Sequence, residues 1–155
     1  MQSIKLGSSE IAQWHALILD AQSSVGFYLP ASIEQYIVMT LNAYTKNTSI
    51  ASVVIAIDYL QALKDSSSLS LQKLRDVGDQ CLILSGLFPE RAARKNLSQE
   101  YFTNIGKEAY YSLSFADSQT IDNQNVFYQL FENFSELIKL LNNTRGINED
   151  FLYYS

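Results

Sequence analysis

The sequence predicts an all-α protein, a compact single-domain bundle or orthogonal array of about six helices. Apolar residues recur at spacings of three and four, which give a helix one buried face. No stretch alternates apolar and polar residues as a half-buried strand does, and the hairpin dipeptides Asn-Gly and Asp-Gly are absent. With 155 residues, 47% of them hydrophobic, the chain has the size and apolar content of one well-filled domain. We expect one domain over residues 1–155, with its core at about residues 9–142 and a tail at residues 146–155.

The first half of the sequence predicts three helices, at about residues 9–24, 33–44 and 50–63. Gly26 is placed to end the first helix, because glycine readily adopts left-handed backbone angles. Pro30 forces the residue before it out of helical geometry, and the second helix is expected to begin after Ser32. The third segment is apolar on most sides, which is typical of a central, buried helix.

A fourth helix is predicted at about residues 70–85, and one of its faces carries small side chains. A glycine inside a helix costs about 1 kcal/mol relative to alanine, and it is usually found where another helix comes close. We therefore expect this face to pack tightly against the third or the last helix, and Gly86 to end the helix in a left-handed conformation. The face comprises Leu71, Leu74, Gly78, Cys81 and Ser85.

Two further helices are predicted at about residues 98–116 and 123–142, with a polar break between them. Ser98 is placed to cap the first of them, with Glu100 in its first turn. The second has the strongest amphipathic pattern in the chain. Its inward positions are Val126, Phe127, Leu130, Phe131, Phe134, Leu137, Ile138 and Leu141.

The net charge of −5 is spread unevenly. Residues 108–155 carry 7 acidic and 2 basic side chains, whereas residues 69–107 carry 6 basic and 4 acidic ones. An acidic chain with an acidic last third repels phosphate backbones, and non-specific nucleic-acid binding depends on basic contacts. The sequence therefore argues against nucleic acid as a partner.

Arg91, Arg94 and Lys95 form the one dense basic cluster in the sequence. Three interpretations remain open: the cluster pairs with the acidic last third of the same chain, meets the acids of a protein partner, or holds an anion. Exposed ion pairs contribute about 0–1 kcal/mol each, so the first, solvated interpretation is the default.

Asp58 interrupts the most apolar predicted helix. A buried carboxylate without a cation or several hydrogen-bond donors costs several kcal/mol. We therefore expect Asp58 either to pair with Arg75 or Arg91 or to lie on a solvent-exposed edge of its helix. Asp79, beside the small-residue face of the fourth helix, is the other acidic candidate for a buried ion pair.

The residues required by familiar catalytic and metal centres are few. His15 is the single histidine and Cys81 the single cysteine, which argues against zinc and di-iron centres, and no phosphate-binding glycine loop occurs. Cys81 is expected to act as a small hydrophobic residue, and His15 as a core or boundary residue. Asp58, Asp76 and Asp79 are the remaining carboxylates that suit acid–base work or an oxygen-coordinated cation, but their spacing does not demand it. We predict no metal, no cofactor and no catalytic residue.

The sequence also carries no secretory or membrane-spanning signal. Its first residues lack an apolar stretch after a basic end, and its longest apolar run, near residues 50–57, is far shorter than the ~20 residues that span a bilayer. Cys81 has no second cysteine with which to form an internal disulfide. We expect a reducing compartment, most simply the cytoplasm.

Residues 78–95, read with the segments near residues 101–114 and 126–141, resemble a widespread family of small uncharacterised bacterial all-helical proteins. The resemblance covers roughly residues 30–141 and implies a single helical domain, but no activity. Its pattern is Gly-Asp, an apolar run, Ser-Gly-x-Phe, a basic pair, and then Tyr-Phe, Gly and Ala-Tyr. The matching positions are Gly78, Asp79, Ser85, Gly86, Phe88, Arg94, Lys95, Tyr101, Phe102, Gly106, Ala109 and Tyr110.

Two functions from different classes fit these observations. The first is a non-enzymatic protein-interaction or scaffold module that associates with a protein partner or with itself. Its interface candidates are the aromatic-rich tail residues Phe151, Leu152, Tyr153 and Tyr154, although packing of this tail on its own core is the simpler interpretation. The alternative is a helical enzyme or a small-ligand or anion sensor, with a pocket entered past Arg91 and Arg94. The tyrosines expected to line that pocket are Tyr44, Tyr59, Tyr110 and Tyr111.

Overall fold

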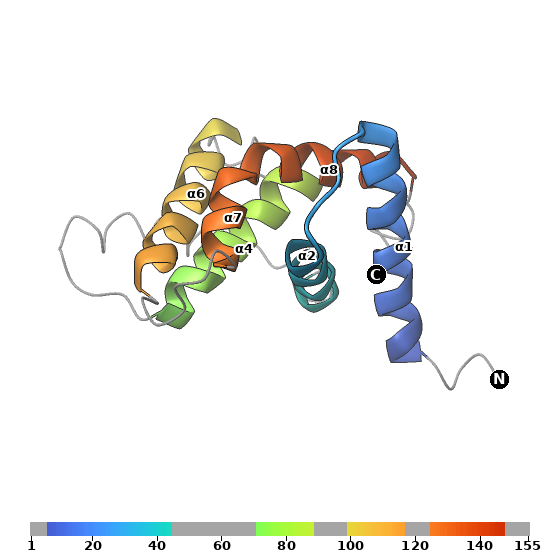
Figure 1. Ribbon diagram of the computed structural model, residues 1–155, viewed down its shortest axis with the longest axis horizontal. Coiled ribbons are helices and arrows are strands. Elements are labelled where there is room, and N and C mark those ends of the chain that lie inside the picture. Colours follow the sequence, from blue (N-terminus) through green and yellow to red (C-terminus); the bar gives the residue numbers. More distant parts are fainter. Residues whose placement is uncertain (1–5, 45–70, 89–98, 117–124, 148–155) are drawn as a thin grey trace.

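The prediction of an all-α fold is confirmed. The computed structural model describes residues 6–44, 71–88, 99–116 and 125–147, and within these ranges it contains helices and no strand (Figure 1). The third predicted helix lies outside these ranges. The described helices are α1 (Leu6–Val25), α2 (Ala31–Tyr44), α4 (Leu71–Leu87), α6 (Gln99–Ala116), α7 (Val126–Glu132) and α8 (Phe134–Ile147).

The turn between α1 and α2 is held by one buried side chain. Gly26 has a φ of +81° and so ends α1 in the left-handed conformation predicted for it. The buried amide of Gln22 donates from Nε2 to Glu34 at 2.7 Å, and its Oε1 accepts from the backbone N–H of Leu29, also at 2.7 Å. Because one side chain satisfies groups on both sides of the turn, the angle between α1 and α2 is set locally.

Helices α4 and α6 lie side by side and make the most extensive helix contact in the described part of the chain (Figure 1). A Cβ added to Gly78 of α4 would lie 2.6 Å from the ring of Tyr110 in α6. A Cβ added to Gly106 of α6 would lie 2.5 Å from the ring of Phe134 in α8 and 3.0 Å from the Cβ of Cys81. Any side chain larger than hydrogen at these two positions would therefore push the helices apart.

Gly86 corrects one prediction. It lies inside α4, which continues to Leu87, and Gly26 is the one glycine with a positive φ among the described residues. A Cβ on Gly86 would lie 2.6 Å from the Cβ of Leu141 in α8. Gly86 therefore serves the close approach of two helices and does not end one.

The last predicted helix is in fact two helices, which is a second correction. Asn125 caps α7, because its Oδ1 accepts from the backbone N–H groups of Phe127 and Tyr128, each at 3.1 Å. α7 ends at Asn133, where the side-chain amide donates to the carbonyl of Gln129 at 2.9 Å and φ is −103° with ψ 15°. The apolar spacing continues through this break and hides it from the sequence.

This break sets the shape of the molecule. α7 lies beside α6, whereas α8 runs across α4 and reaches α1, which in turn packs on α2 (Figure 1). The buried apolar residues of all six described helices form one continuous core. Leu71, which was expected on the packed face of α4, is exposed at the first turn of that helix, so this prediction is wrong. His15, which was expected in the core or at its boundary, is half exposed. None of the described helices combines the length and apolar character needed to cross a membrane.

Candidate functional site

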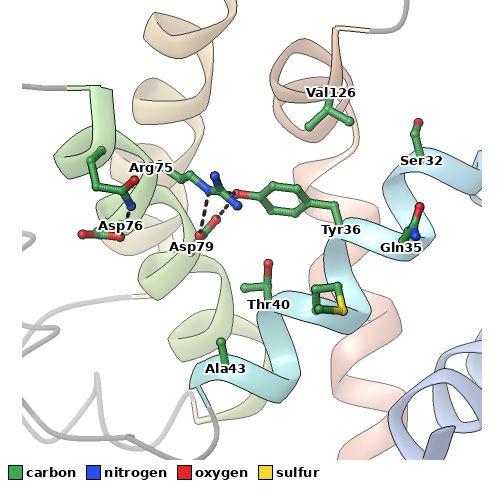
Figure 2. A pocket seen from close by; sticks show the side chains of 11 residues that line it. Ser32, Gln35, Tyr36, Thr40, Ala43, Arg75, Asp76, Asp79 and Val126 are labelled. Atoms are coloured by element: carbon green, nitrogen blue, oxygen red, sulfur yellow. Dashed lines mark hydrogen bonds and ion pairs between the residues drawn. The ribbon is translucent and has the colours of Figure 1, made fainter. Parts of the chain in front are cut away.

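A groove with a volume of about 740 Å³ opens between α2 and α4, with Val126 of α7 at one side. Figure 2 shows its polar wall, where Arg75 and Asp79 of α4 face Tyr36 of α2, while Asp76 points away from Tyr36 and accepts a hydrogen bond from Gln72. Tyr36 and Asp79 are placed here by helical periodicity, because Tyr36 lies three positions after the buried Ile33 and Asp79 lies three positions before the buried Leu82. Polar side chains thus line the edge of the core.

Asp79 is the most deeply buried of these groups, with 3% of its surface exposed. Its Oδ1 accepts a hydrogen bond from the phenol of Tyr110 in α6 at 2.6 Å and another from the phenol of Tyr36 in α2 at 2.7 Å. One carboxylate oxygen therefore connects three helices. Hydrogen bonds to a charged acceptor are about twice as strong as neutral ones, so this junction constrains the positions of all three.

Arg75 covers the outer side of this junction. Its Nε donates to the phenol oxygen of Tyr36 at 3.2 Å and lies 3.9 Å from Oδ2 of Asp79 (Figure 2). Its guanidinium carbon lies 5.3 Å from the centroid of the Tyr36 ring, within the range of a cation–π contact. The distance to Asp79 is that of a loose ion pair and exceeds hydrogen-bond length. About half of the Arg75 side chain is exposed, so solvent screens this charge.

Burial dominates the protonation of the junction. It raises the pKa of Asp79 from 3.8 to about 6, against the hydrogen bonds from Tyr110 and Tyr36 and the charge of Arg75, which lower it, while Asp76 adds to the rise. Burial and the neighbouring Asp79 also raise the pKa of both phenols above the usual value of 10. The phenols are therefore permanent donors, and Asp79 changes its charge near pH 6.

The small-residue face of α4 lies next to this groove but does not line it. Gly78, Cys81 and Ser85 are all buried. Gly78 packs on α6, which is neither of the two partners expected for this face; the third helix lies outside the described residues. Asp79 follows Gly78 directly in the sequence. The same turn of α4 therefore packs on α6 at Gly78 and places the carboxylate of Asp79 at the wall of the groove.

Cys81 and His15 are not arranged as a reactive pair. Cys81 is buried in apolar surroundings that raise the pKa of its thiol, so it stays protonated. His15 is half exposed on α1, with its Nε2 3.5 Å from a carboxylate oxygen of Glu34. Within the described ranges, no group of three or more His, Cys, Asp or Glu side chains is arranged to hold a metal ion.

Several predicted site residues lie outside the described ranges. They are Asp58, the basic cluster Arg91, Arg94 and Lys95, and the tail residues Phe151, Leu152, Tyr153 and Tyr154. The predicted ion pairs of Asp58 therefore lie outside the described residues. Arg75, one of the expected partners of Asp58, is described, and its Nε lies 3.9 Å from Oδ2 of Asp79 on the same helix.

The tyrosine that lines the groove is Tyr36, which was not among the predicted pocket tyrosines. Tyr110 is buried behind Asp79, and Tyr111 points outward from α6; Tyr59 and the side chain of Tyr44 lie outside the described part. Tyr36 lies at helical spacing from the buried residues Ile33 and Thr40, but this spacing carries no sign that an acid from α4 would meet it.

A second surface feature consists of four aromatic rings on α6 and α7, which we call the aromatic patch: Tyr111, Phe115, Tyr128 and Phe131. Ring centroids lie 4.7 Å apart for Tyr111 and Phe115 and 4.8 Å apart for Tyr111 and Phe131. Phe115 is 63% exposed, which is unusual for a phenylalanine in contact with other rings. Contiguous exposed apolar rings are typical of interaction surfaces.

Comparison of the chain with protein-family models, with curated proteins and with solved structures finds no match. The family resemblance of the sequence therefore stays a prediction.

Proposed function

We propose that this protein is a small-ligand-binding domain whose site is the groove between α2 and α4. The observation that carries this proposal is the placement of Asp79, a carboxylate 3% exposed at the wall of an open groove. Binding sites commonly combine an apolar wall with a few convergent polar groups, and a strongly perturbed carboxyl in a cleft is a candidate functional group.

The composition of the groove supports a ligand of mixed character. Met39, Ala43 and Val126 supply apolar surface, whereas Thr40 and Asp79 supply polar atoms. The proposal is one of binding, without a catalytic step. The net charge of −5 argues against nucleic acid as the ligand, and the single buried cysteine suits the cytoplasm.

A thermal-shift screen with compounds of positive, negative and zero charge tests the proposal. A ligand that binds only the folded state at 100 times its Kd adds about 2.7 kcal/mol of stability and raises Tm. The Ala43→Trp variant fills the groove from an exposed position and should abolish the shift. Ala16→Trp, at an exposed position of α1, is the matched control and should retain it.

Two results contradict the proposal. One is the absence of any shift across all three charge classes with the wild-type protein. The other is a ligand whose shift is equal in the Ala43→Trp and Ala16→Trp variants, since that ligand would bind elsewhere.

The second candidate is the protein-interaction module expected from the sequence, and the aromatic patch is the specific observation that favours it. Aromatic side chains are preferred anchors at interfaces. If the protein is such a module, sedimentation velocity should show self-association or binding to a protein partner, and Phe115→Ser should weaken it. Leu19→Ser, which removes an exposed leucine on α1, should leave the association unchanged. A monomer at all concentrations contradicts self-association.

A further inference from the structure

The groove wall carries two carboxylates and one guanidinium, so its formal charge is negative when Asp79 is ionised. Asp76 and Arg75 lie at its outer side, and Asp79 lies innermost with 3% of its surface exposed. The ionisable groups around Asp79 are Tyr36 from α2, Arg75 and Asp76 from α4, and Tyr110 from α6. Both phenols stay neutral, so Arg75 is the one positive charge among these described groups.

Arg75 compensates the charge of Asp79 incompletely. Its Nε donates to the Tyr36 phenol at 3.2 Å and stays 3.9 Å from Oδ2 of Asp79. Both phenols donate to Oδ1, so no described donor lies within hydrogen-bond distance of Oδ2. The pKa of Asp79 is still raised to about 6. Burial therefore outweighs the stabilisation of the charged carboxylate by the two phenols and Arg75.

We propose that the groove, if it is the ligand site described above, binds a primary organic amine as its ammonium ion, with the ammonium group at Oδ2 of Asp79 and the alkyl group on Met39 and Val126. An ammonium ion supplies the charge and the donor that this oxygen lacks. This inference rests on the proposed function and specifies the chemical class of the ligand.

Other charged ligands fit this wall less well. A divalent metal ion prefers six or more oxygen ligands, and the guanidinium of Arg75 lies 3.9 Å from the carboxylate that would have to provide one of them. An anion meets two carboxylates, one of which is buried. A neutral alcohol can donate to Oδ2 but leaves its charge uncompensated.

Three probes with the same alkyl chain test the inference: n-butylammonium, n-butanol and butyrate. Each is titrated into ¹⁵N-labelled full-length protein at about pH 7.5, and amide chemical shifts of Tyr36, Thr40 and Asp79 are followed. We expect saturable shifts with butylammonium and affinity at least about tenfold weaker for the other two, because hydrogen bonds to charged groups contribute about 1.5–3 kcal/mol. At about pH 5, affinity for butylammonium should fall roughly tenfold, because most of Asp79 is then protonated.

The Asp79→Asn variant should lose the preference for butylammonium, whereas Asp20→Asn, an exposed change on α1, should retain it. If Asp79→Asn does not fold, the pH dependence of the wild-type protein decides the question. Groove binding of butanol or butyrate with equal or greater affinity overturns the ammonium inference and leaves the ligand site intact. If none of the three probes shifts the groove amides, the ammonium inference is rejected, and the thermal-shift screen described above decides separately whether the groove binds a ligand.

Discussion

At the scale of single residues, the neighbours Gly78 and Asp79 both contact Tyr110, one through its backbone and the other through its carboxylate. Gly78 has no side chain, and this lets the ring of Tyr110 approach the backbone of α4. The phenol at the end of that ring then reaches Asp79 at 2.6 Å. The close approach and the hydrogen bond therefore depend on each other.

Replacement of Gly78 by alanine should destabilise the protein. The new Cβ would lie 2.6 Å from a carbon of the Tyr110 ring, which cannot move far because its hydroxyl is bound to Asp79. Overpacking costs about 1–3 kcal/mol, and the better helix propensity of alanine returns about 1 kcal/mol. Urea denaturation should show a lower midpoint than wild type, and Gln80→Ala on the same helix serves as the control. A midpoint above the wild-type value would contradict the tight contact between α4 and α6.

Asp79 should also make stability depend on pH. Its pKa is about 6 when folded and 3.8 in an ordinary setting, so the folded chain binds more protons between these values. The contribution of this group to the free energy of unfolding therefore falls as pH rises from about 4 to about 6, and is constant above that. The fall is roughly 3 kcal/mol at about 1.36 kcal/mol per pKa unit.

Urea titrations of wild type and Asp79→Asn across this pH range measure the effect. The asparagine oxygen can still accept hydrogen bonds from both phenols, but the asparagine side chain does not titrate. The unfolding free energy of wild type minus that of Asp79→Asn should therefore increase as pH falls. Parallel pH profiles for the two proteins would contradict the raised pKa. Asp20→Asn controls for the loss of a surface charge.

At the scale of elements, two asparagines decide how the end of the chain folds. Asn125 caps α7 and also donates from its Nδ2 to the carbonyl of Ser114 at 2.9 Å, which ties the start of α7 to α6. Asn133 ends the same helix by binding the carbonyl of Gln129. Asparagine side chains compete with the backbone for hydrogen bonds, and this is why they favour helix ends.

Asn125→Ala should cost about 0.5–2 kcal/mol, the usual range for loss of a helix cap, and toward the upper end because the bond to Ser114 is also lost. Asn104→Ala, at an exposed interior position of α6, should be neutral or slightly stabilising. Thermal unfolding followed by circular dichroism distinguishes the two. Equal Tm values for the two variants would mean that the cap contributes nothing.

At the scale of the whole molecule, the described helices share one core although α1 lies at its end. α8 connects them, because it packs on α4 and on α1. Trp14 of α1 is 1% exposed and belongs to the same buried cluster as Phe134 of α8. A shared core is what makes a domain unfold as one unit.

Trp14 is the only tryptophan in the chain, so its fluorescence reports the part of the core that surrounds α1. Urea unfolding followed by this fluorescence and by helical circular dichroism should give coincident transitions if the chain is one domain. A tryptophan transition at lower urea would show that α1 separates first and that the single-domain prediction is wrong.

Sequence periodicity predicted the positions of most of the described helices and of most of their buried residues, since a helix buries the residues that recur every three or four positions. It missed the division at Asn133, because the apolar spacing of Leu130, Phe134 and Leu137 runs through it unchanged. It also assigned Gly86 to a helix end, since a glycine that ends a helix and one that contacts a neighbouring helix are identical in sequence.

The sequence by itself determined that this chain forms helices, which of their faces are apolar, and that it carries a negative net charge. Only the tertiary structure decided that Tyr36, Asp79 and Tyr110, up to 74 residues apart, meet at one carboxylate oxygen beside a groove. The physical reason is that local spacing specifies which side of a helix turns inward, whereas the partner that it meets there depends on how the helices cross.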